Sequence, residues 1–171
     1  MKILYIHGLD SQPHPDKLSI LEEYGNTPFS LHMDYRKDKA AYWKLRDLAI
    51  EAKVEQLIGS SLGGYFAYWL GQELDIPQLL FNPAMPFRSV NVPGVDAIGE
   101  EATPSKVVLG AQDDIMPANL NQAFFSSRDH ARVITCSWLG HQIDLETFEE
   151  MVRWAGLGTK NVVHNAKGEM G

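Results

Sequence analysis

A serine stands in a glycine-rich motif at residues 59–63, which read G-S-S-L-G. The pattern G-x-S-x-G is typical of a nucleophile elbow, a sharp strand-to-helix turn that presents the serine hydroxyl at the edge of a sheet. An apolar segment precedes the motif at residues 54–58, and a helical pattern begins at Leu62. Glycine is expected at both flanking positions, because a Cβ there would collide across so tight a turn. We therefore predict that Ser61 is a nucleophile.

A glycine-rich turn without chemistry, or one that binds phosphate, is the alternative interpretation of this segment. The phosphate-binding pattern G-x-x-x-x-G-K-[ST] is absent, and no lysine follows the turn until Lys106. The decision between these interpretations depends on whether the sequence also supplies a base and an acid.

A serine hydroxyl needs a general base to act as a nucleophile near neutral pH. The histidines that follow Ser61 are His130, His141 and His164. His130 precedes the last expected strand and would lie at the opposite sheet edge, and His164 belongs to a polar tail. His141 follows the apolar segment 132–136, so it should lie at the same carboxyl-terminal edge as Ser61. We therefore predict that His141 is the base.

An acid that orients the histidine should come between the serine and the histidine in the chain. Asp113 and Asp114 follow the apolar segment 106–109 directly. The frame G-x-x-D-x-x-x-P favours Asp113, and Asp114 stays the alternative. Either residue could instead belong to an acidic first turn of the next helix.

Two backbone N–H groups are expected to stabilise the oxyanion in such a site. Leu62 follows the nucleophile, and its N–H group is the first candidate. The segment H-G-L at residues 7–9 follows the first expected strand, and Gly8 allows a sharp turn there. The Leu9 N–H group is the second candidate, and His7 is assigned a structural role.

The elements that position these residues alternate along the chain. Short apolar segments that read as strands lie at residues 3–6, 29–33, 55–58, 78–81, 106–109 and 132–136. Helical patterns occur within residues 15–24, 39–52, 62–74, 118–127 and 145–154. Continuous apolar strands between helices favour a parallel sheet that is buried on both faces. We expect an α/β fold of three layers, with a doubly wound, mostly parallel sheet of about six strands.

Residues 1–156 are predicted to form one domain, with a short cap or loop at about residues 82–105, where prolines are frequent. A polar C-terminal tail is expected at residues 157–171. The apolar run at the N-terminus is too short for a signal peptide. Asn82 is expected to brace the loop at the end of its strand.

Composition excludes several classes of function. The 171 residues carry a net charge of −7, with 15 basic against 22 acidic side chains and no basic run, which argues against nucleic-acid binding. No segment approaches the roughly 20 apolar residues of a membrane helix. A single cysteine, Cys136, rules out an intrachain disulfide and fits a reducing cytoplasm. We expect a cytoplasmic protein with neither nucleic-acid nor membrane partners; oligomeric state leaves no mark on the sequence.

Together these features resemble the α/β-hydrolase superfamily, and within it the small bacterial YqiA/YcfP-type esterases. The resemblance is carried by I-H-G-L-D-S at residues 6–11, G-S-S-L-G-G-Y at 59–65, F-N-P-A at 81–84, the two aspartates 113–114 and G-H at 140–141. It implies a minimal α/β-hydrolase fold, a triad of Ser61, Asp113 and His141, and activity on small acyl esters without a cofactor or metal. The segment between residues 84 and 106 is shorter than in these relatives, so any lid should be small.

The sequence therefore predicts a serine hydrolase whose substrate is a small-molecule acyl ester. A thioesterase, an amidase and a lactonase remain alternatives, because one acyl-enzyme scheme serves all of them. A binding module on a hydrolase scaffold is an alternative of a different class, and it predicts no labelling by a fluorophosphonate.

Overall fold

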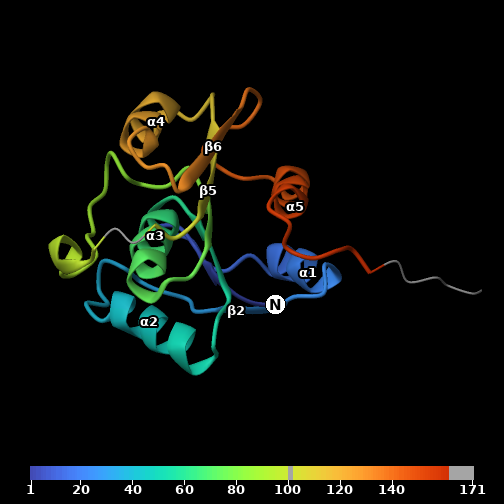
Figure 1. The fold of residues 1–171 in the computed structure, drawn as a ribbon, viewed down its shortest axis with the longest axis horizontal. Coiled ribbons are helices and arrows are strands. Elements are labelled where there is room, and N and C mark those ends of the chain that lie inside the picture. The colour runs from blue at the N-terminus through green and yellow to red at the C-terminus, as the bar shows by residue number, and fades with distance from the viewer. Residues whose placement is uncertain (100–101, 162–171) are drawn as a thin grey trace, which may run out of the picture.

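A six-stranded sheet forms the centre of the computed structural model, which describes residues 1–99 and 102–161 (Figure 1). The strands are β1 (Lys2–Ile6), β2 (Thr27–Ser30), β3 (Gln56–Ser60), β4 (Gln78–Phe81), β5 (Ser105–Gly110) and β6 (Ala131–Cys136). The helices are α1 (Pro15–Glu23), α2 (Ala41–Glu51), α3 (Leu62–Leu74), α4 (Ala118–Phe125) and α5 (Leu145–Trp154). The strand order is β2-β1-β3-β4-β5-β6, and every neighbouring pair is parallel.

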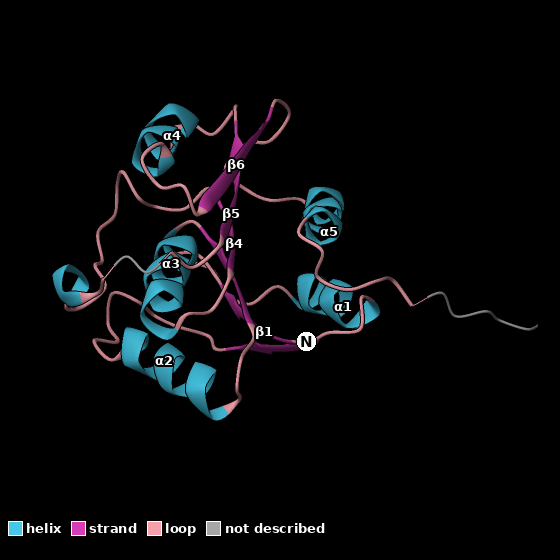
Figure 2. Ribbon diagram, in the orientation of Figure 1, coloured by secondary structure: helices cyan, strands magenta, loops and turns pink. Residues whose placement is uncertain are grey.

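The helices form a layer on each face of the sheet (Figure 2). Helices α1 and α5 lie on one face, and α2, α3 and α4 lie on the other. Each layer encloses its own apolar cluster against the sheet. In β1, Ile3 belongs to one cluster and Leu4 to the other, and both are fully buried. Burial on both faces explains the continuous apolar strands, and the predicted three-layer, doubly wound parallel fold is confirmed.

Some element boundaries differ from the sequence-based expectation. Strand β2 covers Thr27–Ser30 rather than residues 29–33. It is an edge strand paired only with β1, so Pro28 is tolerated there. The chain leaves the sheet after Ser30, and the Met33 N–H group donates to His7 Nε2 at 2.9 Å instead of to a strand. The expectation for residues 31–33 was therefore wrong, since an apolar pattern does not distinguish a strand from a segment that packs on a loop.

The connection from β4 to β5 is a loop in its described parts, residues 82–99 and 102–104, with one short 3₁₀ turn, η1 (Val95–Ala97). Its beginning packs into the core beside α3, where Ala84, Met85 and Val92 are buried. At the C-terminus, Leu157 is buried, and Lys160 forms ion pairs with Glu23 and Glu149. The rest of the predicted tail, residues 162–171, lies outside the described residues.

The order of the strands creates a switch point between β1 and β3. From β1 the chain moves to β2 on one side, and it then returns to add β3 and the later strands on the other side. The loops that leave the carboxyl ends of β1 and β3 therefore diverge toward opposite faces of the sheet. In open parallel sheets, the crevice at such a point is where ligands bind. Ser61 directly follows β3, and His7 directly follows β1.

Candidate active site

Ser61 occupies a strained turn between β3 and α3. Its φ of 53° and ψ of −120° fall in a region that non-glycine residues rarely adopt. The Ser61 N–H group donates to the Phe81 carbonyl at the end of β4, at 2.9 Å. The Ser61 carbonyl accepts from the N–H groups of Tyr65 (3.1 Å) and Ala84 (2.9 Å). Contacts with two neighbouring segments therefore hold the serine in this conformation.

Two glycines make the turn sterically feasible. A Cβ on Gly59 would lie 2.3 Å from the carbonyl oxygen of Gly63, and one on Gly63 would lie 2.2 Å from the carbonyl oxygen of Ile6. Both distances are far below van der Waals contact with backbone atoms that cannot move without distorting the sheet. The glycine at each flank of the elbow is thus required by backbone packing, as the motif predicted.

His141 lies within hydrogen-bond distance of both Ser61 and Asp113. Its Nε2 atom is 3.1 Å from Ser61 Oγ, and its Nδ1 atom is 2.8 Å from Asp113 Oδ2. With Asp113 ionised, Nδ1 carries the hydrogen, so Nε2 is left to accept from the serine hydroxyl. The structure therefore brings together the three residues that were predicted as the triad, from the carboxyl ends of β3, β5 and β6.

The two neighbouring aspartates have different environments. The Asp113 side chain is fully buried at its ion pair with His141, whereas Asp114 is exposed. The second Asp113 oxygen, Oδ1, accepts from the N–H groups of Ile115 at 2.9 Å and Met116 at 2.8 Å. These bonds fix the carboxylate and leave Oδ2 facing the imidazole, so geometry favours Asp113 over Asp114 as the partner of His141.

The Asn82 side chain ties the histidine loop to the sheet. Asn82 is fully buried and has a φ of 41°. Its Nδ2 group donates to the carbonyl of Gly140 at 2.9 Å and to that of His141 at 3.2 Å. Its Oδ1 atom accepts from the Gly110 N–H group at 2.7 Å. One side chain at the end of β4 thus braces both loops that carry the partners of Ser61.

The loop after β1 lies against the elbow. A Cβ on Gly8 would lie 3.4 Å from both the Ser60 carbonyl oxygen and Ser61 Cβ, so this loop passes beside the serine. His7 is 1% exposed, and burial lowers its pKa below the ordinary value. Its Nδ1 atom lies 2.7 Å from the Gly8 carbonyl, and its Nε2 atom accepts from Met33. A neutral His7 therefore anchors the segment that carries Leu9, which agrees with a structural role.

A cavity of about 250 Å³ opens beside Ser61 and His141. Gly8 and Leu9 of the β1 loop line it, together with residues of the β1–α1 connection and of the His141 loop. The remaining lining residues are Tyr5, Ser11, Gln12, His14, Lys17, Ser60, Gln142 and Ile143. A larger cavity of about 450 Å³ lies near Trp43 and Gln72, and no member of the triad lines it. We place the candidate site in the smaller cavity, because only that one contacts the reactive groups.

Other residues considered from the sequence lie elsewhere. His130 packs beside Tyr68 at the opposite end of β6, with ring centroids 6.3 Å apart. His164 lies outside the described residues. Within residues 1–99 and 102–161, no group of three or more His, Cys, Asp or Glu side chains could hold a metal ion. None of the helices in this described part of the chain has the length and apolar character needed to cross a membrane.

The parallel sheet, with the serine turn at its switch point, is the α/β-hydrolase fold, and comparison with solved structures agrees. A hydrolase of the alpha/beta superfamily from Xanthomonas campestris pv. campestris matches with a TM-score of 0.69 at 20% identity, over 90% of this chain and 97% of that one. Est1E from Butyrivibrio proteoclasticus, solved with ferulic acid bound, matches with a TM-score of 0.69 at 18% identity, over 91% and 88%. Mouse alpha/beta hydrolase domain-containing protein 10 matches with a TM-score of 0.66 at 15% identity, over 91% and 88%.

The family follows from the sequence itself. Residues 2–144 match the uncharacterised protein family UPF0227, and the chain belongs to that family. This assignment confirms the predicted resemblance to YqiA/YcfP-type proteins of the α/β-hydrolase superfamily.

Sequence reasoning did not identify the part of the cavity lining that comes from the β1–α1 connection and the start of α1. Its residues are Ser11, Gln12, His14 and Lys17. A lysine in the first turn of a helix looks like any solvated lysine in the sequence, so no local signal marked it. Its burial arises only when α1 packs against α5.

Proposed function

We propose that this protein is a serine hydrolase that cleaves small acyl esters. The observation that carries the proposal is the continuous contact from Asp113 through His141 to Ser61, with the serine held in a strained elbow. A nucleophile, a base and an orienting acid in this arrangement are the elements of an acyl-transfer site.

In the first step, Ser61 Oγ attacks the carbonyl carbon of the ester, and His141 Nε2 takes the hydroxyl proton. Asp113 holds the imidazole in the required tautomer and stabilises the imidazolium. Collapse of the tetrahedral intermediate breaks the ester C–O bond. His141 then gives its proton to the departing alkoxide, and the acyl group stays on Ser61.

In the second step, water attacks the acyl-enzyme. His141 removes a proton from the water, whose oxygen bonds to the acyl carbon. The Ser61–acyl bond then breaks, the proton returns to Ser61 Oγ, and the carboxylic acid leaves. The reaction consumes one ester and one water, and it draws only on groups of the chain and on water.

The oxyanion of both intermediates is assigned to the N–H groups of Leu9 and Leu62. Leu62 is the first residue of α3, where N–H groups have no partner within the helix. Leu9 lines the same cavity as Ser61. These two N–H groups would then donate to the developing oxyanion. Removal of one such donor typically costs about 2.7–4 kcal/mol of transition-state stabilisation.

The size of the cavity supports a small substrate. At about 250 Å³, it lies just below the roughly 300–1,000 Å³ of typical small-molecule sites. No described residue of the β4–β5 loop lines it. A short acyl group fits such a space, and a long acyl chain would extend into solvent.

Hydrolysis of p-nitrophenyl acetate tests the proposal. Wild-type protein is expected to turn over this ester, and Ser61→Ala and His141→Ala are each expected to remove nearly all turnover without changing the circular dichroism spectrum. Full activity in Ser61→Ala would contradict the assignment of the nucleophile. A panel of matched acyl thioesters, amides and lactones then separates an esterase from hydrolases that use the same triad.

A further inference from the structure

Lys17 is a buried cation in the candidate active site. It lies in the first turn of α1, and only 8% of the residue is exposed. Lysine is almost never buried to this degree unless its ammonium is paired. Lys17 therefore needs an explanation that an ordinary surface lysine does not.

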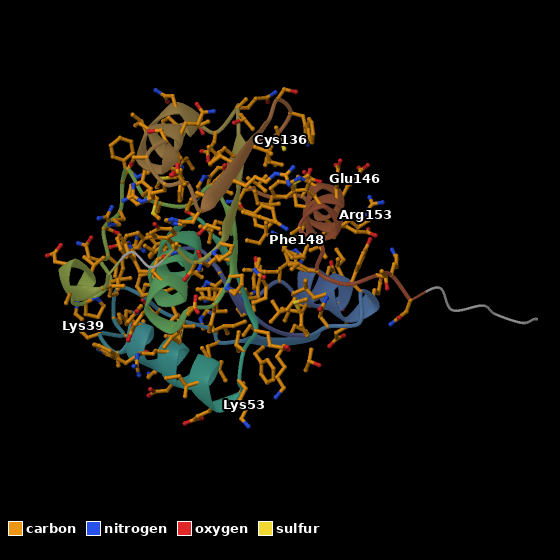
Figure 3. The ribbon with its side chains drawn as sticks, viewed as in Figure 1. Lys39, Lys53, Cys136, Glu146, Phe148 and Arg153 are labelled. Carbon is orange, nitrogen blue, oxygen red and sulfur yellow. The ribbon has the colours of Figure 1, made fainter. Side chains whose placement is uncertain are left out.

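No carboxylate of the described residues forms an ion pair with this ammonium group. Among residues 1–99 and 102–161, the Lys17 side chain makes neither a hydrogen bond nor an ion pair. The carboxylate of Asp144 attracts it, but this carboxylate caps α5 by accepting from the N–H and hydroxyl groups of Thr147, each at 2.8 Å. The remaining contact is with the Phe148 ring, whose centroid lies 5.5 Å from Lys17 Nζ. Figure 3 shows Phe148 on α5, the helix packed beside α1.

The ammonium group reaches the cavity and is not sealed in the core. The fully enclosed polar side-chain atoms that lack a partner in the described chain belong to Trp69, Gln72 and Asn121, and Lys17 Nζ is not one of them. Lys17 lines the cavity of about 250 Å³ that Ser61 and His141 also line. A ligand that fills this small space would therefore contact the serine and the lysine at the same time.

We propose that the ester substrate carries an anionic carboxylate close to its scissile bond, and that the Lys17 ammonium binds this carboxylate. The inference rests on the proposed function and names its substrate class. The carboxylate can lie at the end of a short acyl group or on the alcohol that leaves. Both sources supply the same chemistry to Lys17, and they are separated by experiment.

Electrostatics support an anion at this position. Burial lowers the pKa of Lys17 to about 8, and the attraction of Asp144 opposes this only in part. A carboxylate in contact would favour the charged ammonium and form a charge-assisted hydrogen bond. The other titratable groups at the cavity are His14, His141 and Tyr5, and burial raises the pKa of Tyr5 to about 12, so it stays neutral.

Two pairs of esters test the substrate class. Methyl hydrogen succinate and methyl succinamate differ only in a carboxylate against a neutral amide on the acyl side. Acetoxyacetate and acetoxyacetamide differ in the same way on the leaving-group side. At pH 7, the ratio of kcat/KM for the acid over its amide is expected to fall about tenfold or more in Lys17→Met for one of the pairs. Lys53→Met removes an exposed cation at the distant end of α2 and should keep the wild-type ratio (Figure 3).

The same ratio should fall in wild-type protein as pH rises from 7 to 9.5, because Lys17 loses its proton through about pH 8. Lys17→Met should show no such fall. An equal acid-to-amide ratio in wild type and Lys17→Met, for both pairs of esters, would overturn the proposal. That result would leave Lys17 as a buried cation that is stabilised only by the attraction of Asp144 and the contact with the Phe148 ring.

A binding measurement separates this proposal from the proposed function. In Ser61→Ala, titration with methyl hydrogen succinate should shift the Lys17 ε-methylene signal in a ¹³C–¹H NMR spectrum, assigned by its absence in Lys17→Met. Methyl succinamate should leave that signal in place. If Ser61→Ala retains full hydrolysis, the catalytic assignment fails while the NMR titration still tests Lys17. Acetoxyacetate is titrated in the same way, and if neither it nor methyl hydrogen succinate moves the signal, the carboxylate site is refuted whatever the fate of Ser61.

Discussion

The candidate-site cavity has two walls that are built in opposite ways, the first formed by Ser61 and His141 and the second by the β1–α1 connection with Lys17. On the first wall, Ser61 and His141 are joined by hydrogen bonds to each other and to the buried Asp113 behind them, and Asn82 braces the loops that carry His141 and Asp113. On the second wall, the ammonium of Lys17 makes neither a hydrogen bond nor an ion pair within the described chain, and only the attraction of Asp144 and the contact with the Phe148 ring offset its burial. The first wall is complete without a ligand, and the second is not. This contrast supports the two proposals made above, that the first wall performs the chemistry and that the second selects the substrate.

The largest expected effect on the first wall is the loss of kcat when Asp113, but not its neighbour Asp114, is replaced. Asp113→Asn keeps the shape but favours the wrong tautomer of His141, so kcat for p-nitrophenyl acetate should fall by about 10⁴-fold. Asp114→Asn is the matched control, since Asp114 is exposed, and its kcat should stay within about twofold. Similar losses in both variants would place the orienting acid elsewhere.

Substitution of Gly63, which flanks the elbow, tests whether backbone packing holds Ser61 in its conformation. Gly63→Ala places a Cβ 2.2 Å from the Ile6 carbonyl oxygen, so it should lower the free energy of unfolding by about 3 kcal/mol or more. Gly140→Ala meets its nearest atom at 3.9 Å and should change stability by less than about 1 kcal/mol. Urea denaturation measures both. A stable, active Gly63→Ala protein is incompatible with the described elbow.

Substitution of Lys17 should have the opposite effect and raise the free energy of unfolding, because the buried ammonium on the second wall destabilises the fold. A pKa lowered from 10.5 to about 8 means that the folded protein disfavours the ammonium. At about 1.4 kcal/mol per pH unit, this destabilises the protein on the order of 3 kcal/mol at pH 7. The penalty is full below pH 8 and disappears as pH rises toward 10.5, where the unfolded chain also loses its proton.

Lys17→Met is therefore expected to be more stable than wild type by about 1–3 kcal/mol at pH 7, with a smaller gain at pH 9.5. Urea denaturation at the two pH values checks this. A loss of stability at pH 7 would show that Lys17 contributes favourable interactions to the fold, contrary to the contrast between the walls.

Asn82 should give the smallest effect, because it acts through His141. Asn82→Ala and Asn82→Gly both remove the bonds to Gly140, His141 and Gly110, and glycine also tolerates the φ of 41°. Both variants should lower kcat about tenfold with little change in KM, and Asn82→Gly should be the more stable of the two. A rise in KM with unchanged kcat would place Asn82 in substrate binding and not in positioning.

Local patterns in the sequence predict much of the fold and of the first wall. The helices at Leu62–Leu74 and Leu145–Trp154 were predicted with their observed bounds from helical spacing, and for the first of them the glycine turn also marks where it begins. The meeting of Ser61, Asp113 and His141 follows from their places after parallel strands, whose carboxyl ends share one edge. Lys17 shows the limit of such patterns, since its burial depends on contact with Phe148, 131 positions further along the chain.

Active-site labelling tests the central claim, that Ser61 is an activated nucleophile, most directly. Wild-type protein is incubated with a fluorophosphonate probe, and the modified peptide is identified by mass spectrometry. We predict a single adduct on Ser61, which disappears in Ser61→Ala and is strongly slowed in His141→Ala. The absence of labelling in folded wild-type protein, or an adduct on another residue that persists in Ser61→Ala, would contradict the account and favour a binding module on a hydrolase scaffold.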